Sequence, residues 1–277
     1  MSDFIKHGFS RSREQRTMPA QRFQRGDEIA EFSQGECAQS IAQQFKSLVG
    51  SYGERIAVVA PNRDSLTHAT LFKQIAQIVD ALNNLGIGTG DRVALVLPDG
   101  LKTAVAFLGV ASGAACAPLN PNFREQEFIS IFDDLRPKAV IVDADTDAAA
   151  VEAAAARSIP LIRLSVVRDD GSTKFVLFGE TLAPPSRTGF ASTADVALVL
   201  FTSGTTARPK LVPLTHANLL ASAHNIATSL RLSPDDRCLN IMPMFHIHGL
   251  IGGLLASLVS GGSVVCPPKF AAADFFN

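Results

Sequence analysis

Residues 200–210, LFTSGTTARPK, bring hydroxyl side chains, a glycine and a lysine together in one short stretch. The groups that could donate hydrogen bonds or charge belong to Thr202, Ser203, Gly204, Thr205, Thr206 and Lys210. Hydroxyls and converging backbone N–H groups favour anions, and a lysine adds a full positive charge. The stretch therefore predicts a polyphosphate-binding loop, although it lacks the Walker spacing. An ordinary surface loop stays open as an alternative, because the same residue types form turns.

Histidines could position a substrate, move a proton or bind a metal. His246 and His248 lie in PMFHIHGL, residues 243–250, and we interpret His248 as held by local backbone hydrogen bonds. The other histidines show no ligand spacing and are predicted to be structural: His7, His68, His216 and His224. His216 and His224 share a predicted helix but are too far apart to bind one metal together. No metal site is predicted.

The elements around residues 200–210 would place that loop at a binding edge. The run VALVL before it reads as a buried strand, and KLVPL after it reads as a second strand. In an open parallel sheet, ligands gather beyond the carboxyl ends of the strands. A loop that leaves such a strand is therefore well placed to bind a ligand.

Strand-like and helix-like segments alternate along the chain, which is typical of parallel βαβ units. Strands are predicted at 55–61, 92–98, 114–120, 138–143, 160–165, 196–201, 210–214, 237–242 and 263–268. Helices are predicted at 36–53, 66–86, 101–113, 124–135, 146–157, 215–232 and 250–261. A hairpin around Asp-Gly is predicted at 166–178, at a sheet edge. The predicted fold class is α/β, with two successive α/β subdomains and mostly parallel sheets.

Three regions are predicted along the chain. Residues 1–36 form a polar N-terminal tail, and residues 37–185 form the first α/β subdomain. Residues 186–277 start a second α/β subdomain that carries the phosphate loop and is incomplete, because 271–277 read as the beginning of a helix. The stretch 179–195, rich in Pro, Ser, Thr and Gly, connects the two subdomains.

Composition narrows the class of protein. With 277 residues, 47% of them hydrophobic and 18% charged, the chain can bury a core and is not generally disordered. A formal net charge of -1 gives no reason to expect a nucleic-acid partner. The cysteines Cys37, Cys116, Cys238 and Cys266 are widely spaced, so we predict reduced and mostly buried thiols.

One apolar stretch, residues 247–266, is long enough to cross a bilayer. Its five glycines and its histidine favour a buried helix followed by a strand over a single membrane span. The N-terminus lacks the apolar segment of a secretory signal. We therefore predict a soluble, cytoplasmic protein.

The segment TSGTTARPK followed by LVPLTHANL resembles the phosphate-binding signature of the adenylate-forming (AMP-binding) superfamily, in its acyl-CoA synthetase branch. PMFHIHGL is similar to the segment that these ligases place beside the acyl group. GDRVALVLPDG and APLNPNFREQEF resemble earlier landmarks of the superfamily, and PMFHIHGLIGGLLASL is most similar to oxalate-type CoA ligases. The resemblance covers the chain from about residue 37 to its end.

The resemblance implies a ligase that uses ATP and Mg²⁺ to activate a carboxylic acid as an acyl-adenylate and then transfers the acyl group to coenzyme A. It also implies which residues would bind the β- and γ-phosphates of ATP: Thr202, Ser203, Gly204, Thr205, Thr206 and Lys210. It implies that His246 is a catalytic residue beside the substrate carboxylate and the path of the thiol, where it would position the substrate or control access. A role for His246 as general base is also open. Phe245 and Gly249, with His246, would line the substrate pocket, and core packing is an alternative for Phe245.

Two positions depart from the usual pattern of the superfamily, which has Gly where this chain has Ala207 and Leu211. If either position needs a positive φ, the loop would be strained by ~1 kcal/mol or more. The segments that the superfamily uses for adenine, ribose, the Mg²⁺-binding Glu and the C-terminal lysine lie downstream and are not found here. We therefore expect an N-terminal part that is inactive alone.

Two other hypotheses stay open. The chain could be a non-catalytic nucleotide-binding or interaction fragment of the same family. It could also be a structural protein that forms a homo-oligomer, or self-associates through its incomplete second subdomain.

Overall fold

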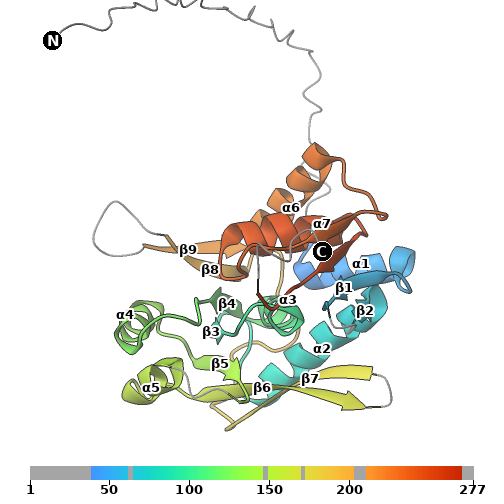
Figure 1. The fold of residues 1–277 in the computed structure, drawn as a ribbon. Coiled ribbons are helices and arrows are strands. Elements are labelled where there is room, and N and C mark those ends of the chain that lie inside the picture. Colours follow the sequence, from blue (N-terminus) through green and yellow to red (C-terminus); the bar gives the residue numbers. More distant parts are fainter. Residues whose placement is uncertain (1–38, 62–64, 146–148, 170–171, 203–209, 270–277) are drawn as a thin grey trace, which may run out of the picture. The chain divides into compact units, whose positions relative to one another are not determined.

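Two β-sheets organise the residues that the computed structural model describes, which are 39–61, 65–145, 149–169, 172–202 and 210–269 (Figure 1). All of these residues belong to one unit, Gly35–Asn277. The elements up to the hairpin are α1 (Ile41–Tyr52), β1 (Ile56–Val59), β2 (Ser65–Thr67), α2 (His68–Asn84), β3 (Arg92–Val96), α3 (Leu101–Gly113), β4 (Ala115–Pro118), α4 (Glu125–Leu135), β5 (Ala139–Asp143), α5 (Ala149–Ala156), β6 (Leu161–Asp169) and β7 (Ser172–Gly179). The elements after it are β8 (Val196–Thr202), β9 (Lys210–Thr215), α6 (His216–Leu230), β10 (Arg237–Leu239), the π-helix η1 (His248–Leu255), α7 (Ala256–Val259) and β11 (Ser263–Val265).

The larger sheet has the strand order β7-β6-β5-β3-β4-β8-β9. Its four central pairings are parallel, and the two hairpins β6–β7 and β8–β9 add an antiparallel strand at each edge. The predicted α/β class with mostly parallel sheets is thus confirmed. The predicted edge hairpin is confirmed as well, although its first arm and the strand predicted at 160–165 form one strand, β6.

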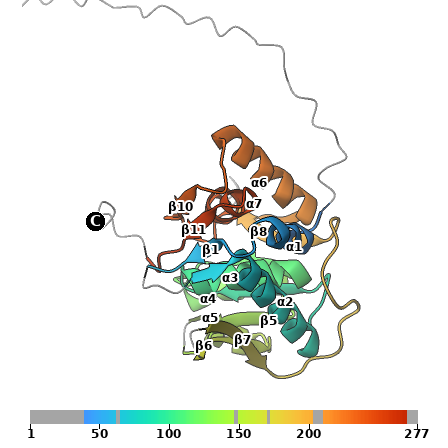
Figure 2. The ribbon, with the colours of Figure 1, turned by 90° about the vertical axis from the view of Figure 1, so that its right-hand side faces the viewer.

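The sequence of each central strand places apolar side chains on both faces of this sheet. In β3, Ala94 and Val96 point to one cluster with α4 and α5, whereas Val93 and Leu95 belong to a larger cluster on the opposite face. The larger cluster joins α2 and α3 with α1, α6 and the smaller sheet (Figure 2). Strands buried on both faces explain why these runs are continuously apolar in the sequence.

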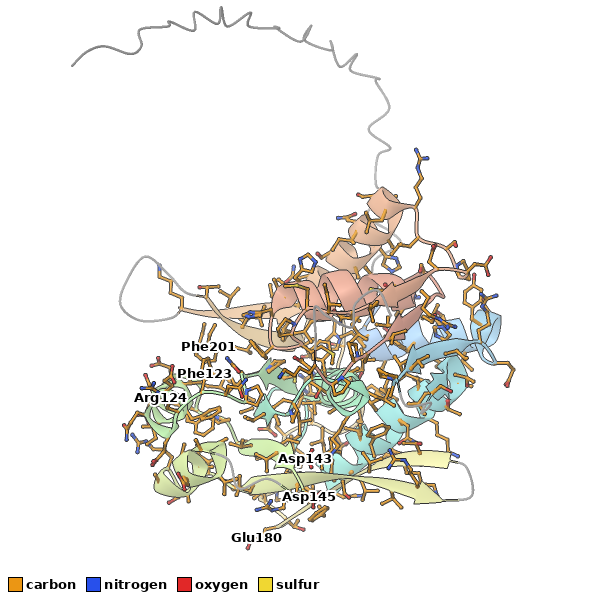
Figure 3. All side chains as sticks on the ribbon, in the orientation of Figure 1. Phe123, Arg124, Asp143, Asp145, Glu180 and Phe201 are labelled. Atoms are coloured by element: carbon orange, nitrogen blue, oxygen red, sulfur yellow. The ribbon has the colours of Figure 1, made fainter. Side chains whose placement is uncertain are left out.

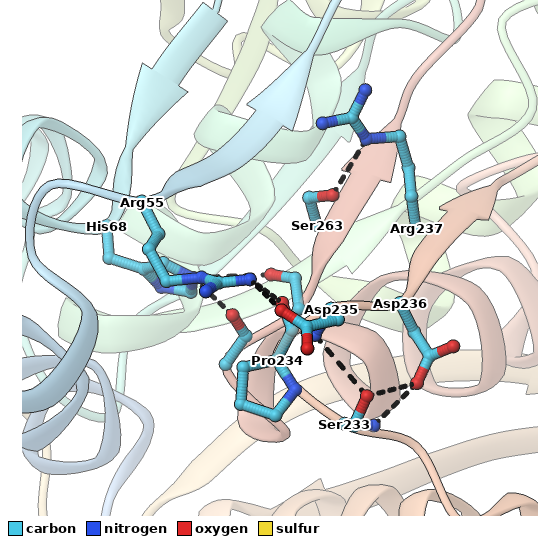
Figure 4. Close-up of polar contacts among 10 residues, drawn as sticks. Arg55, His68, Ser233, Pro234, Asp235, Asp236, Arg237 and Ser263 are labelled. Atoms are coloured by element: carbon cyan, nitrogen blue, oxygen red, sulfur yellow. Dashed lines mark hydrogen bonds and ion pairs between the residues drawn. The ribbon is translucent and has the colours of Figure 1, made fainter.

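The smaller sheet has the order β10-β11-β1-β2, with parallel β10–β11 and β11–β1 pairs. At the amino ends of these strands, Arg55 donates to the Pro234 carbonyl and pairs with Asp235 at 2.7 Å (Figure 4). Nearby, Nε2 of the buried His68 lies 3.3 and 3.2 Å from the carbonyls of Gly261 and Gly262. These contacts tie distant segments together at the edge opposite to the loops discussed below.

Side-chain caps fix where several helices begin. Ser40 and Gln43 form a capping box at α1, and Thr215 and Asn218 form another at α6. The helix predicted from residue 66 begins only at His68, because Thr67 is its N-cap and residues 65–67 pair with β1 instead. This start was predicted wrongly, since the pairing partner of β2 lies outside the local pattern.

Residues 247–266 form the predicted helix followed by a strand, as η1, α7 and β11. Among the residues that the structure describes, no helix has the length and hydropathy needed to cross a bilayer. Cys116 and Cys266 are buried and Cys238 is half-buried, all unpaired, whereas Cys37 lies outside the described residues. The predicted boundary at 185/186 falls between β7 and β8, yet strands from both sides of it share both sheets. The subdomain division stays a prediction.

Candidate functional site

The carboxyl ends of the parallel strands β3, β4, β5 and β8 meet at one edge of the larger sheet. We call this the carboxyl edge. Asp99 follows β3 there, Asp143 ends β5 and Thr202 ends β8. Because ligands of open α/β sheets bind at this edge, it is the candidate functional site.

The predicted phosphate loop begins and ends at this edge. Thr202 and Lys210 are register partners in the antiparallel β8–β9 pair, and both are exposed. The remaining predicted loop residues, Ser203, Gly204, Thr205 and Thr206, lie outside the described residues, as does Ala207. The structure thus brings the two ends of the loop together and leaves the predicted cradle as a prediction.

Leu211, one of the two departures from the usual signature, lies in β9 opposite Phe201. It is not among the described non-glycine residues with positive φ, which are Arg136, Ser158 and Arg231. Its side chain packs with Phe123 and Phe201 against the α4–α5 side of the sheet. A leucine at this position therefore causes no backbone strain.

Other side chains along the carboxyl edge are charged or aromatic. Figure 3 labels Phe123, Arg124 and Phe201 near the β8 end, and Asp143 and Asp145 beyond β5. Asp143 accepts a hydrogen bond from Lys102 of α3 at 2.5 Å. The edge thus carries groups of both charge signs, rather than one basic patch.

His246 lies in the turn that follows β10, residues 241–247, which we call the His246 turn. Its imidazole is exposed, and its ring centroid lies 4.5 Å from that of the half-buried Phe245. Within the turn, the His246 N–H donates to the Pro243 carbonyl at 3.1 Å. His248, also exposed, begins η1. The structure thus presents His246 to solvent from a closed turn.

Gly249 lies directly beneath the His246 turn. It is buried, and a Cβ at this position would lie 2.5 Å from the Pro243 carbonyl oxygen and 2.7 Å from that of Met242. A side chain larger than hydrogen would therefore push the turn away from η1. Its predicted place in the substrate pocket stays a prediction, but its packing role is visible.

The Asn240 side chain links the start of the His246 turn to η1 by hydrogen bonds. This buried side chain donates from Nδ2 to the Gly249 carbonyl at 3.0 Å, and its Oδ1 accepts the Met242 N–H at 3.3 Å. Gly253 of η1 leaves room for this amide, because a Cβ there would approach Oδ1 to 2.5 Å.

Asp99 connects the His246 turn to the larger sheet. Its Oδ1 accepts the backbone N–H of Met244 at 2.7 Å. Burial raises the pKa of the Asp99 carboxyl, whereas the Met244 N–H and the charge of His246 lower it. The hydrogen bond from Met244 is thus the direct link between Asp99 and the His246 turn.

A cleft of about 340 Å³ opens beside Asp99. Its lining includes Lys102, Arg168, Phe175 and Cys266. Burial raises the pKa of the Cys266 thiol to about 12, so this thiol is not a ready nucleophile.

Asp99 and Asn240 were missed by the sequence analysis. A carboxylate three residues after a buried strand, at the predicted carboxyl edge, is a signal that could have identified Asp99. For Asn240, the signal was a polar amide inside a run predicted as a strand. In the part of the chain that the structure describes, no three His, Cys, Asp or Glu side chains cluster closely enough to hold a metal ion.

Comparisons with known proteins give a consistent picture. The profile of a family described as AMP-binding enzyme matches residues 45–277. An oxalate–CoA ligase of Saccharomyces cerevisiae is 34% identical over 261 residues, which span 82% of this chain and 47% of the yeast protein. A probable CoA ligase of Humulus lupulus, CCL9, is 34% identical and covers 84% of this chain and 45% of its own. The chain therefore spans under half the length of these relatives.

Solved structures are also similar. ATP-bound MatB from Rhodopseudomonas palustris matches with a TM-score of 0.67 and 26% identity, over 83% of this chain and 46% of MatB. A long-chain-fatty-acid CoA ligase homologue from the same organism matches with a TM-score of 0.68 at 23% identity, which supports the fold alone.

Proposed function

The chain belongs to the AMP-binding enzyme family, and on this premise we propose that it forms the N-terminal part of an ATP-dependent acid–thiol ligase. The proposed reaction has two steps. A carboxylate oxygen attacks the α-phosphorus of ATP and pyrophosphate leaves, which gives an acyl-adenylate. The sulfur of coenzyme A then attacks the acyl carbon, and AMP leaves as the thioester forms.

One observation of the structure supports this proposal most directly. Thr202 and Lys210 are paired across β8–β9 at the carboxyl edge, so the two ends of the predicted phosphate loop lie together. A loop closed in this way can direct several donors toward one ligand. We propose that Thr202, Ser203, Gly204, Thr205, Thr206 and Lys210 hold the β- and γ-phosphates of ATP. The Lys210 ammonium would offset negative charge as pyrophosphate departs.

We assign the acyl side of the reaction to the His246 turn. His246 would stand beside the substrate carboxylate and the path of the thiol, and Phe245 and Gly249 would shape the wall of the pocket. Two of the relatives are named oxalate–CoA ligases, from Saccharomyces cerevisiae and Arabidopsis thaliana. A small dicarboxylic acid is therefore the first substrate to test.

Mg²⁺ would accompany ATP in this chemistry and spread the phosphate charge. The described residues offer no clustered set of three acidic, His or Cys ligands. We therefore assign the ion no protein ligand among them and no step of its own.

The proposal includes two further expectations. We expect the 277-residue chain to carry the part of the site that binds the triphosphate of ATP, without catalysing the reaction alone. We also expect the protein to lie in the cytoplasm. The alternative is a non-catalytic fragment that binds nucleotide or a protein partner. The proposal and this alternative differ in whether a longer product of the same gene catalyses the reaction.

Calorimetry with ATP and Mg²⁺ on the 277-residue chain tests the phosphate loop. We expect binding that Lys210→Ala weakens about 10- to 100-fold, since a charge-assisted hydrogen bond contributes about 1.5–3 kcal/mol. Lys46→Ala is the matched control, because Lys46 is an exposed lysine on α1. Absent binding, or equal binding by the Lys210 and Lys46 variants, would contradict the assignment.

Exchange of labelled pyrophosphate into ATP tests the reaction itself. The assay is run with oxalate, malonate and a medium-chain fatty acid, on this chain and on any longer product of its reading frame. Acid-dependent exchange supports the ligase. Nucleotide binding without exchange in either protein supports the non-catalytic alternative.

A further inference from the structure

We infer that Asp99 is a positioning residue for His246: its carboxylate anchors the His246 turn to the carboxyl edge of the larger sheet and fixes where the imidazole lies. The role of His246 in this inference rests on the proposed function. The anchoring itself rests on contacts of described residues alone.

The Asp99 side chain reaches the turn from the loop between β3 and α3. Asp99 precedes Gly100, the N-cap of α3, whose φ of +132° is one that a residue with a side chain rarely adopts. In the same loop, the Thr103 hydroxyl donates a hydrogen bond to the Pro98 carbonyl. This loop therefore has contacts of its own, apart from the turn that Asp99 holds.

The hydrogen bond from Met244 to Asp99 joins the two sheets. Met244 itself is buried, and its N–H lies 2.7 Å from Asp99 Oδ1, across 145 residues of sequence. Asn240 closes the turn onto η1 through Met242 and Gly249. Asn240 thus fixes the shape of the turn, whereas Asp99 fixes its place relative to β3 and α3.

The charge of Asp99 acts on the same turn. The charge of His246 lowers the pKa of Asp99, against the larger effect of burial. Among the described residues that line the cleft beside Asp99, the other charged or titratable groups are Lys102 of α3, Arg168 of β6 and Cys266 after β11. Lys102 is paired with Asp143 at 2.5 Å. We therefore expect the Asp99 carboxylate to attract His246 as well as hold the Met244 amide.

For an acid–thiol ligase, such an anchor would have a direct use. The imidazole must keep its place beside a carboxylate in one step and beside a thiol path in the next. Placement errors of about 1 Å at a reacting group can slow a reaction about 100-fold. Because the larger sheet also carries the predicted phosphate loop, an anchor from this sheet would fix the His246 turn relative to that loop.

Hydrogen exchange of the backbone amides tests the anchor without any need for activity. We expect Asp99→Ala to speed the exchange of the amides in residues 242–247 about tenfold or more, and Asp99→Asn, which keeps an acceptor oxygen, to stay within about threefold of the wild type. Asp133→Ala, which removes an exposed carboxylate paired with Arg157, is the control and should leave the turn unchanged. Unchanged exchange in Asp99→Ala, or equal loosening in Asp99→Asn, would overturn the hydrogen-bonded anchor.

A second measurement addresses the charge and does not depend on the folding of the Asp99 variants. We expect His246→Gln to raise the pKa of Asp99, followed by the ¹³C shift of its carboxyl group, because the favourable charge of the imidazolium is lost. An unchanged Asp99 pKa would show that the charge of His246 does not act on this carboxylate. Both measurements remain decisive if no pyrophosphate exchange is found, so a failure of the proposed reaction is distinguishable from a failure of the anchor.

Discussion

His216 shows how burial can dominate the protonation of a side chain. It is fully buried at the start of α6, and its Nδ1 accepts the Ile41 N–H at 3.1 Å. The acceptor role of Nδ1 requires the neutral ring with its proton on Nε2, which has no hydrogen-bond partner among the described residues. Burial lowers the pKa of His216 to about 4, and the charge of Asp195 opposes this effect.

This lowered pKa predicts acid sensitivity. The unfolded chain would protonate His216 near the ordinary histidine pKa of 6.5, whereas the folded protein holds it neutral down to about pH 4. Stability is therefore present above the unfolded pKa and is lost as pH falls toward the folded pKa, by about 3 kcal/mol in full. Burial also lowers the pKa values of His68 and His224, which adds to the effect in the same direction.

The measurement is urea unfolding of the wild type and of His216→Asn at about pH 7.5 and about pH 5. We expect the wild type to lose about 2 kcal/mol more than the variant between these pH values. The variant should be less stable near pH 7.5 by about 1–2 kcal/mol, because the Ile41 N–H loses a well-placed acceptor. Equal losses in the two proteins would show that His216 is not held neutral.

At the scale of elements, glycines decide how closely α2 and α3 pack. A Cβ at Gly109 of α3 would lie 2.7 Å from three side-chain atoms of Ile78 in α2, including its own Cβ, which cannot rotate away. Gly50 of α1, in contrast, is exposed, and a Cβ added there would have no atom within 4 Å. The same substitution should therefore have opposite effects in the two helices.

We expect Gly109→Ala to lower the free energy of unfolding by about 1–3 kcal/mol through overpacking. Gly50→Ala should raise it by about 0.5–1 kcal/mol, because Ala favours a helix interior over Gly. Urea unfolding of both variants measures this difference. Adding Ile78→Ala to Gly109→Ala should show a favourable coupling, and purely additive effects would argue against the contact.

Local patterns predicted most of these elements because they are local in origin. The apolar run of β3 and the start of α6 near Thr215 were predicted from neighbouring residues, whereas α1 begins at Ile41 and not at the predicted residue 36. The extent of β6 could not be predicted in this way, because its first half pairs with β5, whereas residues 162–169 pair with β7. The π-helical form of η1 also leaves no mark in the apolar pattern.

The same distinction applies to the candidate site. Thr202 and Lys210 belong to one short motif, and the structure pairs them. Asp99 and Met244 meet across 145 residues, so only the folded chain shows that they interact. A site formed by one short motif can be predicted from the sequence, whereas a long-range contact that positions a turn cannot.

At the scale of the whole molecule, one edge strand of each sheet, β10 and β7, carries exposed apolar side chains. Leu239 on β10 is 44% exposed, and Met242 and Ile247 of the following turn are 38% and 50% exposed. β10 ends the smaller sheet, so its outer backbone groups lack a neighbouring strand among the described residues. An exposed edge strand of this kind can pair with a strand of another molecule, and a net charge of -1 gives little repulsion between copies.

We therefore expect the 277-residue chain to self-associate through the β10 edge, which would also cover the His246 turn. Light scattering across a concentration series should give a mass that rises above that of one chain, and Leu239→Lys should return it toward the monomer, since a charge on an edge strand opposes pairing. Phe178→Lys is the matched control, because Phe178 is 46% exposed on β7, the edge of the other sheet. A monomer mass at every concentration would contradict association, and a drop in mass with Phe178→Lys but not Leu239→Lys would move the contact to β7.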